Sequence, residues 1–186
     1  DDLSLSEVFS EVNKTTDDRI ISSGSYATWS GTAWSGSLTE INNTKSYTLY
    51  FQEPQVLEMY SVGSVVQGAG GEPLNSLSLN NGWNWFSYLP NDKRPLNTTV
   101  FSLSQEAETG DIIKSQTAFV TYLSASDLGG DSEEGVWLGT LSHLHPGEGY
   151  RSKLTNIATL TYQENDDGGR SMEVFNLVNN IDSLYQ

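Results

Sequence analysis

The chain repeats a pattern of residues, and this repeat limits the folds open to it more than any other feature. One block of the pattern recurs 92 residues later, and the next block recurs 103 residues later. The matched positions are Val8-Phe9 with Val100-Phe101, Ile20-Ile21 with Ile112-Ile113, Trp34 with Trp137, Gly36 with Gly139, Leu38 with Leu141, and Tyr47 with Tyr150. The change of spacing falls in Ser124–Gly135, whose composition is that of a loop. The sequence therefore predicts one small structural unit that is present twice.

The second copy begins with a segment that has no counterpart in the first copy. Its sequence GWNWFSYLP, at Gly82–Pro90, predicts a strand, and a shift of 92 residues places the equivalent strand before Asp1. We therefore expect the first copy to lack its opening strand. Proteolytic processing, the boundary of a fragment, or a strand supplied from elsewhere would each account for this.

The repeat and the local composition divide the chain into four parts. We expect a first repeat unit over residues 1–63, incomplete at its N-terminus, and a second over residues 75–163. A Gly-rich linker at residues 64–74 separates them. Residues 164–186 are predicted to form an acidic loop and then a C-terminal helix or extension. The helical spacing that supports the helix is that of Val174, Leu177, Val178 and Ile181.

Most other segments predict strands, so the expected fold class is mostly β with minor α. A short helix is predicted within Leu3–Val12, where Ser4 or Ser6 can cap its start, and a weaker one at Asn97–Ser104. The predicted strands are Ser46–Gln52, Val56–Val62, Trp83–Tyr88, Thr117–Leu123, Gly135–Leu141 and Ile157–Tyr162. We therefore expect two tandem, related, small β-rich units, each with one short helix.

The charge balance excludes one class of partner. The chain has 24 acidic and 9 basic residues, which gives a net charge of −15. A nucleic-acid-binding surface needs clustered Lys and Arg, and the sequence shows no such cluster, so no nucleic-acid partner is expected. The acidity also argues against an anionic membrane surface, and no apolar run is long enough for membrane insertion. An acidic surface attracts cations, including Ca²⁺, and it also keeps a protein soluble.

Three motifs of the second copy resemble a known repeat. They are GWNWFS, GDIIKSQTAF and WLGTLSHLHPGEGY. These motifs are similar to the tandem GWNW / GDxIxSQ / WxGxL-PGxGY repeat modules of secreted and cell-surface proteins from marine microbes and algae. The second copy matches from Gly82 to Tyr162, and the first copy matches more weakly, with DRIISS and NNTKSY in the equivalent places. The resemblance implies an accessory or adhesive module that is secreted or located at the cell surface.

Two acidic segments are candidates for a calcium site, and calcium is the one cofactor that the sequence indicates. The first set lies within eight residues and consists of Asp127, Asp131, Glu133 and Glu134. The second set is Glu164, Asp166 and Asp167. Ca²⁺ prefers such hard oxygen ligands, but the spacing is not that of an EF-hand loop. The alternative is that both segments are solvated acidic loops.

Trp83, Trp85 and Trp29 are candidate ligand-binding residues, because exposed indole rings can stack on sugars. Trp83 and Trp85 alternate along one predicted strand, so both side chains should face the same side. Trp34 and Trp137 occupy equivalent places in the two copies, which indicates packing within each unit. Core packing remains the alternative for all five tryptophans of the chain.

His143 and His145 flank Leu144 in a way that would place both rings on one face of a strand. A metal would need a third ligand beside them, and the equivalent places in the first copy hold Glu40 and Asn42. The simpler interpretation is that the two histidines are ordinary turn residues.

The sequence carries no motif of a known catalytic site. It has no G-x-S-x-G elbow, no P-loop and no G-x-G-x-x-G before a helix, so we do not expect an enzyme. We expect a non-enzymatic extracellular or cell-surface module with a structural or adhesive role. An open sheet edge in the first copy would let it assemble with copies of itself or with neighbouring repeat modules. The alternative is a carbohydrate-binding module that binds glycans through exposed Trp and Tyr.

Overall fold

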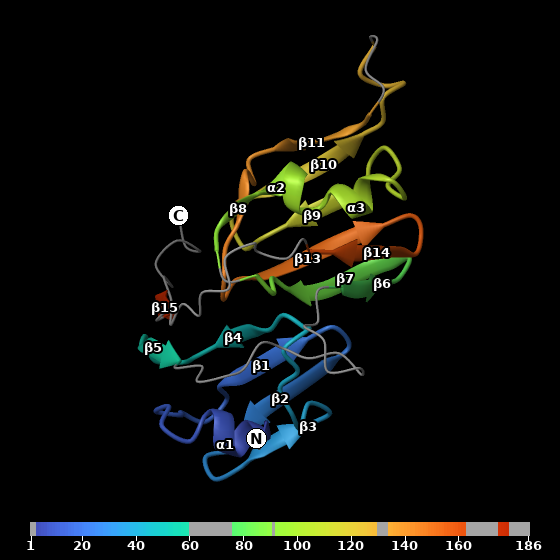
Figure 1. Cartoon of the computed structure of the whole chain (residues 1–186). Coiled ribbons are helices and arrows are strands. Elements are labelled where there is room, and N and C mark those ends of the chain that lie inside the picture. The colour runs from blue at the N-terminus through green and yellow to red at the C-terminus, as the bar shows by residue number, and fades with distance from the viewer. Residues whose placement is uncertain (1–2, 60–75, 91, 130–133, 163–174, 179–186) are drawn as a thin grey trace, which may run out of the picture. The chain divides into compact units, whose positions relative to one another are not determined.

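The chain forms two compact units that are mostly β, which confirms the predicted fold class. A computed structural model describes residues 3–59, 76–90, 92–129, 134–162 and 175–178. The first unit comprises Asp1–Gly63 and Met172–Gln186, and the second comprises Ser64–Ser171. Figure 1 shows their sheets, coloured blue to teal in the first unit and green to orange in the second. Within the described residues, no helix has both the length and the apolar character needed to cross a membrane.

The first unit is built on a four-stranded antiparallel sheet with the strand order β3-β2-β1-β4. Its strands are β1 (Arg19–Ser22), β2 (Ser25–Trp29), β3 (Trp34–Gly36) and β4 (Thr48–Tyr50). The helix α1 (Leu5–Val8) packs against one face of this sheet. Its contact is a small buried cluster that consists of Leu5, Phe9, Ile20 and Ala27.

The second unit has a five-stranded sheet with the order β11-β10-β9-β13-β7. Its strands are β7 (Gly82–Ser87), β9 (Ile112–Lys114), β10 (Phe119–Leu123), β11 (Val136–Gly139) and β13 (Gly149–Leu154). Two further strand pairs are β8 (Arg94–Pro95) with β12 (His143–Leu144), and β6 (Ser76–Leu79) with β14 (Ala158–Thr161). The helices α2 (Leu96–Thr99) and α3 (Phe101–Ser104) bury Leu96, Val100 and Leu103 in the same apolar core as Ile113, Val120 and Trp137.

The helices are short, and their lengths follow from local chemistry. Ser4 caps α1, because its side chain accepts a hydrogen bond from the backbone N–H of Glu7 at 3.4 Å. In the second unit the predicted helix is two separate turns, α2 and α3, which meet at Val100. β-branched residues disfavour a continuous helix here, and the Thr99 hydroxyl donates to the carbonyl oxygen of Pro95 at 2.7 Å. Such single turns depend on tertiary packing for their stability.

A glycine contact occurs at the same place in both units and explains the shared W-x-G-x-L motif. Gly36 has a φ angle of 148° and Gly139 has a φ angle of 155°. A Cβ atom at Gly36 would lie 2.2 Å from the carbonyl oxygen of Tyr26. A Cβ atom at Gly139 would lie 2.3 Å from the carbonyl oxygen of Phe119. Because no side chain fits these distances, both strand pairs require glycine.

Two buried aspartates also make equivalent contacts in the two units. The carboxylate of Asp18 accepts a hydrogen bond from the backbone N–H of Gln52 at 2.7 Å. The carboxylate of Asp111 accepts one from the backbone N–H of Thr155 at 2.9 Å. Each bond joins the start of an inner strand to the segment that follows the neighbouring strand. Gln52 and Thr155 are 103 residues apart, so the second predicted spacing agrees with the geometry.

The first predicted spacing is wrong by one residue. Asp18 and Asp111 are 93 residues apart, and Ile20 therefore corresponds to Ile113, the fully buried residue of β9. At the helices the spacing is 91 residues, since the backbone N–H groups of Leu5 and Leu96 donate to equivalent carbonyl oxygens. The prediction aligned both residues of the two Ile-Ile pairs, whereas the spacing of 93 aligns only Ile20 with Ile113.

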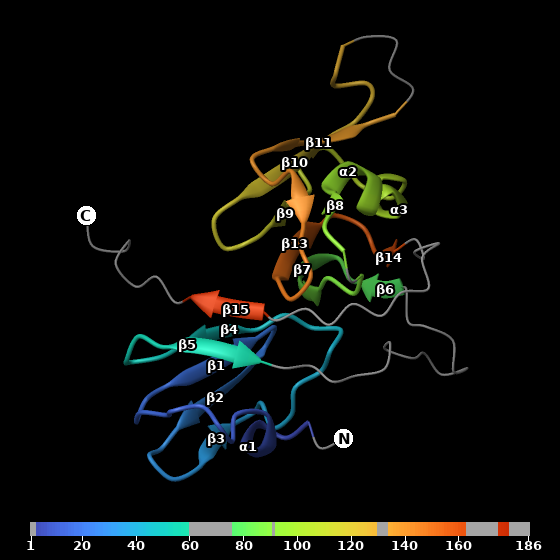
Figure 2. The same cartoon turned by 60° about the vertical axis from the view of Figure 1, so that its left-hand side comes forward.

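The two units differ at β7, the strand that the sequence predicted to open the second copy. There β7 pairs with β13 along six residues, whereas β4, the equivalent of β13, pairs only with β1 among the described strands. A second difference is that residues from the far end of the chain join the first unit. The strand β15 (Phe175–Val178) pairs antiparallel with β5 (Val56–Met59), as β6 pairs with β14 in the second unit (Figure 2).

For the C-terminal segment a helix or an extension was predicted, and its described part is the strand β15. Within the described residues of that segment, Phe175–Val178 are extended and not helical. Apolar residues at helical spacing indicated a helix, but a short segment of this composition takes its conformation from its partner. That partner is β5, which lies more than a hundred residues earlier and which the local pattern could not identify.

Candidate functional site

The predicted calcium segment is only partly described. Asp131 and Glu133 lie outside the described residues, as do Glu164, Asp166 and Asp167. The carboxylate of Asp127 accepts hydrogen bonds from the hydroxyls of Thr109 and Ser124, the latter at 2.7 Å. These bonds, that of Thr109 first, lower the pKa of Asp127. Both hydroxyls donate to the same oxygen, Oδ2, of Asp127.

Glu134 and Asp127 have different neighbours. It borders an open hollow in the second unit that Asn97, Ser104 and Tyr122 also line. Among the described residues, no three His, Asp or Glu side chains form a group that could hold a metal. Calcium at this loop therefore stays a prediction.

The polar groups around this hollow bond one another. The Asn97 side chain accepts from the backbone N–H of Trp137 at 2.9 Å and donates to its carbonyl oxygen at 3.1 Å. The Tyr122 hydroxyl donates to the carbonyl oxygen of Ser104 at 2.9 Å. Burial first, and then the charge of Glu134, raise the pKa of Tyr122, so this phenol stays neutral. These groups hold α3 and β11 in place.

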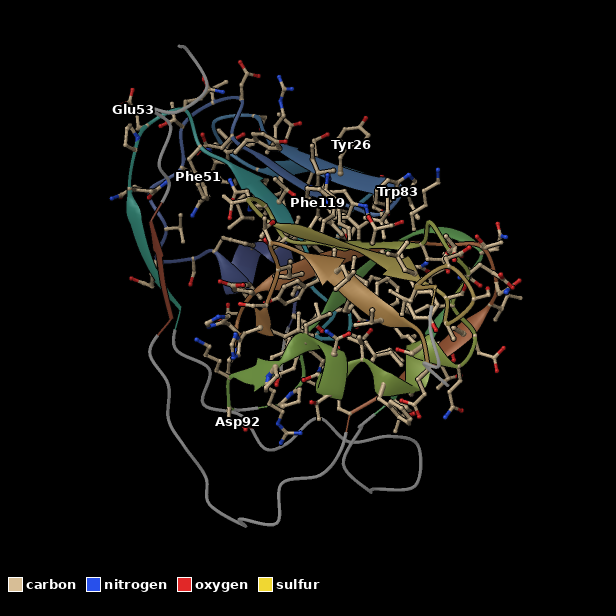
Figure 3. All side chains as sticks on the ribbon, turned by 90° about the horizontal axis from the view of Figure 1, so that it is seen from above. Tyr26, Phe51, Glu53, Trp83, Asp92 and Phe119 are labelled. Atoms are coloured by element: carbon tan, nitrogen blue, oxygen red, sulfur yellow. The ribbon has the colours of Figure 1, made fainter. Side chains whose placement is uncertain are left out.

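Trp83 and Trp85 lie on β7 and face the same side, as the alternation predicts. The inward residues of this strand are the buried Asn84 and Phe86. The Trp83 side chain is 50% exposed, which makes it the more accessible of the two indoles. Phe119 of β10, also exposed, projects from the same sheet (Figure 3).

Both indoles lie close to cations from other strands of the sheet. The guanidinium carbon of Arg151 lies 3.7 Å from the ring centroid of Trp85. The Nζ atom of Lys114 lies 5.9 Å from the ring centroid of Trp83. Both distances are within the range of cation–π attraction, which fixes the rings and the charges together.

Trp29 lies in the first unit, on β2, and is half-buried. Its ring meets that of Trp34 edge-on, with 5.4 Å between the centroids. The Nζ atom of Lys14 lies 5.3 Å from the Trp29 ring and donates a hydrogen bond to the carbonyl oxygen of Val12 at 2.8 Å. Trp29 therefore has a packing role within its own unit, at the place where the second unit has Tyr122 against Trp137.

The two histidines do not act together. His143 Nδ1 lies 3.0 Å from the hydroxyl of Ser142, and His143 belongs to the short strand β12. His145 contributes its backbone N–H, which donates to the Tyr150 hydroxyl at 2.8 Å. The same bond occurs in the first unit, where the Asn42 N–H donates to Tyr47 at 2.6 Å. This tyrosine-held turn explains why the position tolerates either His or Asn.

Burial raises the pKa of Tyr150, and a hydrogen bond from its hydroxyl to Glu148 adds to the shift. Burial also raises the pKa of Tyr88 and Tyr162, whose rings meet edge-on at 5.5 Å. These phenols remain neutral at ordinary pH. The Tyr88 hydroxyl donates to the carbonyl oxygen of Asp92, and the Tyr162 hydroxyl donates to that of Ser87. These two bonds lie at the border of the apolar core.

The sequence did not predict that three cations gather beside the tryptophans. Lys114 lies on β9, and Arg151 and Lys153 lie at alternate positions of β13. A signal was present, because basic residues at i and i+2 of a strand share one face, and such a pair is unusual in a chain with 9 basic residues. The neighbouring strands that complete the group could not be known without the sheet order.

Comparison of the whole chain with family models, with curated proteins and with solved structures finds no match.

Proposed function

We propose that the chain is a non-enzymatic structural or adhesive module of an extracellular or cell-surface protein. We propose further that it joins copies of itself, or neighbouring modules, by strand exchange at its first unit. The observation that carries this proposal is the pairing of β15 with β5. The first unit receives from a distant part of the chain the strand that the second unit supplies by itself, β6.

A strand that arrives from a distant part of the sequence can also arrive from another molecule. Domain swapping needs only that a connecting segment passes to a neighbour instead of returning, and the same strand-to-strand hydrogen bonds then form between two molecules. The backbone hydrogen bonds of the ladder supply affinity for any extended segment. The resemblance to repeat modules of secreted and surface proteins supports the location that we propose.

Cysteine cross-linking distinguishes exchange between molecules from pairing within one. The chain has no cysteine, and Glu58 of β5 stands opposite Asn176 of β15 in the register. We would prepare Glu58→Cys and Asn176→Cys as separate chains, mix them, unfold and refold them together, and oxidise. Strand exchange predicts a linked species of twice the chain mass on a non-reducing gel.

The matched control is the equivalent pair of strands in the second unit. Ser78 of β6 and Thr159 of β14 are opposite each other and both are exposed. Mixed Ser78→Cys and Thr159→Cys chains should give only background linkage, because β6 directly precedes β7 in the chain and so stays with its own unit. If the Glu58→Cys and Asn176→Cys mixture also gives background linkage, while the double variant links within one chain, strand exchange is wrong.

A further inference from the structure

The outer face of the sheet in the second unit has a charge opposite to that of the chain. Along β7, β9 and β13 the outward positions hold Trp83, Trp85, Ile112, Lys114, Arg151 and Lys153. No outward position of the five strands carries Asp or Glu, all of these strands being described. Three of the 9 basic residues thus share one face of a chain whose net charge is −15.

The strand register places these residues in two rows across the sheet. In one row Arg151 stands between Trp85 on β7 and Lys114 on β9. In the other row Lys153 stands next to Trp83. Directly opposite residues on antiparallel strands have Cβ atoms about 5 Å apart, so like charges such as Arg151 and Lys114 repel and destabilise the sheet. The cation–π contacts of these two charges with Trp85 and Trp83 offset part of this repulsion.

We propose that this face binds an acidic polysaccharide, a chain of sugar rings that carry carboxylate or sulfate groups. We name it the Trp–cation face and define it by Trp83, Trp85, Lys114, Arg151 and Lys153. This proposal is independent of strand exchange, since it concerns the second unit and a different surface.

The chemistry of the face fits such a ligand in two ways. A half-exposed indole offers a flat apolar plate for the C–H face of a sugar ring, and an indole is also the aromatic ring best suited to holding a cation. Trp83 and Trp85 are two residues apart, which is about 7 Å along a strand, so the two indoles lie in line along the ligand. Arg151 lies over one face of the Trp85 ring, so the half-exposed Trp83 is the plate on which a sugar ring can stack. A negative group of the same or the next sugar would then lie beside Arg151, Lys114 or Lys153. Arginine adds a planar donor geometry that matches carboxylate and sulfate oxygens.

The number of cations on the face and the net charge of the chain favour a polysaccharide over a nucleic acid as the ligand. Nucleic-acid affinity typically rests on about 6–10 neutralised phosphates, and the Trp–cation face offers three cations. The net charge of −15 also repels a dense polyanion over long range. A polysaccharide with a negative group on only some of its rings needs fewer cations for binding. It also gains binding free energy when its sugar rings stack on an indole.

The test is isothermal titration calorimetry on the full chain at low salt, with two matched pairs of probes. Partly methyl-esterified polygalacturonate is compared with its fully methyl-esterified form, and sparsely sulfated dextran with unmodified dextran. We expect both charged polymers to bind and both neutral polymers to bind at least tenfold more weakly. Binding should weaken as salt is raised. Oligo(dT) serves as the nucleic-acid probe and should bind more weakly than either charged polysaccharide.

Three variants locate the site. Trp83→Ala and Lys153→Glu should each weaken binding of both charged polymers at least tenfold. Ile157→Ala, a change at a side chain that is 71% exposed and not part of any strand, should leave binding unchanged. Thermal unfolding by circular dichroism shows whether each variant is folded. Because Trp83 and Lys153 are exposed, their loss should shift the melting temperature little.

Several outcomes would overturn the proposal. Equal binding of charged and neutral polymers would show that the cations play no part. Tighter binding of oligo(dT) would assign the face to nucleic acid, and no binding of any probe would exclude a polyanion site. Wild-type affinity in folded Trp83→Ala and Lys153→Glu would place binding elsewhere on the chain. None of these outcomes bears on strand exchange, which the cross-linking of β5 and β15 tests separately.

Discussion

The two units hold an equivalent tryptophan in different ways. In the second unit, Trp137 Nε1 donates a hydrogen bond to the Ser104 hydroxyl at 3.0 Å. In the first unit, Trp34 Nε1 is buried and has no hydrogen-bond partner among the described residues. Trp34 relies instead on edge-on contacts with Phe9, at 5.8 Å between centroids, and with Trp29. The comparison teaches that this fold depends on the position of the ring, while the polar contact of the ring can be lost.

Other contacts are kept in both units, and these define the fold. The buried aspartate, the close-approach glycine and the tyrosine-held turn occur at equivalent places with the same partners. In each of these contacts one of the two partners is a backbone group. A change of side chain elsewhere therefore does not remove that partner. Variants at the shared contacts should therefore affect both units, and variants at the unshared contacts should affect only one.

The largest effect is expected at the buried aspartates. Asp111→Ala removes the acceptor of three hydrogen bonds, from the N–H of Glu108 and from the N–H and hydroxyl of Thr155. Because two backbone N–H groups lose their partner, we expect the free energy of unfolding to fall by about 3–5 kcal/mol. Urea titration followed by circular dichroism measures this change.

Asp18→Ala is the matched variant in the first unit. Its carboxylate accepts two hydrogen bonds, from the N–H groups of Thr15 and Gln52, so we expect a smaller loss of about 2–3 kcal/mol. A larger loss for Asp18→Ala than for Asp111→Ala would contradict the view that the number of bonds sets the cost.

The next effect is expected at the glycines of the W-x-G-x-L motif. Gly139→Ala brings a Cβ atom against a carbonyl oxygen and also imposes an unfavourable φ angle, so we expect a loss of about 2–4 kcal/mol. Gly36→Ala should cost a similar amount. Gly129→Ala is the control, because its φ angle is positive but no atom lies within 4 Å of the added Cβ, and it should cost about 1 kcal/mol. Equal effects of Gly139→Ala and Gly129→Ala would show that the close approach is unimportant.

A smaller effect is expected at Ser104. Ser104→Ala removes the acceptor of the Trp137 N–H and brings the second unit to the condition of the first, so we expect a loss of about 1–2 kcal/mol. Adding Trp137→Phe, which removes the unsatisfied donor, should make the loss due to Ser104→Ala disappear. A double-mutant cycle by urea unfolding measures this coupling. Additive losses would mean that the hydrogen bond contributes nothing.

The sequence predicted the mostly β class, a cap at Ser4 or Ser6 and the shared face of Trp83 and Trp85, because each depends on local residue patterns; the cap is Ser4. It missed the correct spacing of the first block, because the Ile-Ile pairs match fully at a spacing of 92 residues, whereas the spacing of 93 matches Asp18 with Asp111 but only one Ile with Ile. It left a helix and an extension open where β15 is a strand, and it did not predict the Trp–cation face. Both features are created by pairing between segments distant in sequence, and a local pattern holds no information about such pairs.

The smallest change in the free energy of unfolding is expected at Ser152, and there the substitution should stabilise the protein. Its side chain is fully buried between β7 and β9, and its hydroxyl has no hydrogen-bond partner among the described residues. The equivalent position in the first unit is Leu49, so the fold itself does not need a hydroxyl here. Since burial of an unpaired hydroxyl is unfavourable, Ser152→Ala should raise the free energy of unfolding by about 1 kcal/mol, while Ser78→Ala, at an exposed position, should change it little. Urea unfolding of the two variants side by side measures the difference. A loss of stability in Ser152→Ala would mean that a bound water satisfies the hydroxyl, and the two units would then differ by a hydrated site and not by an unfavourable one.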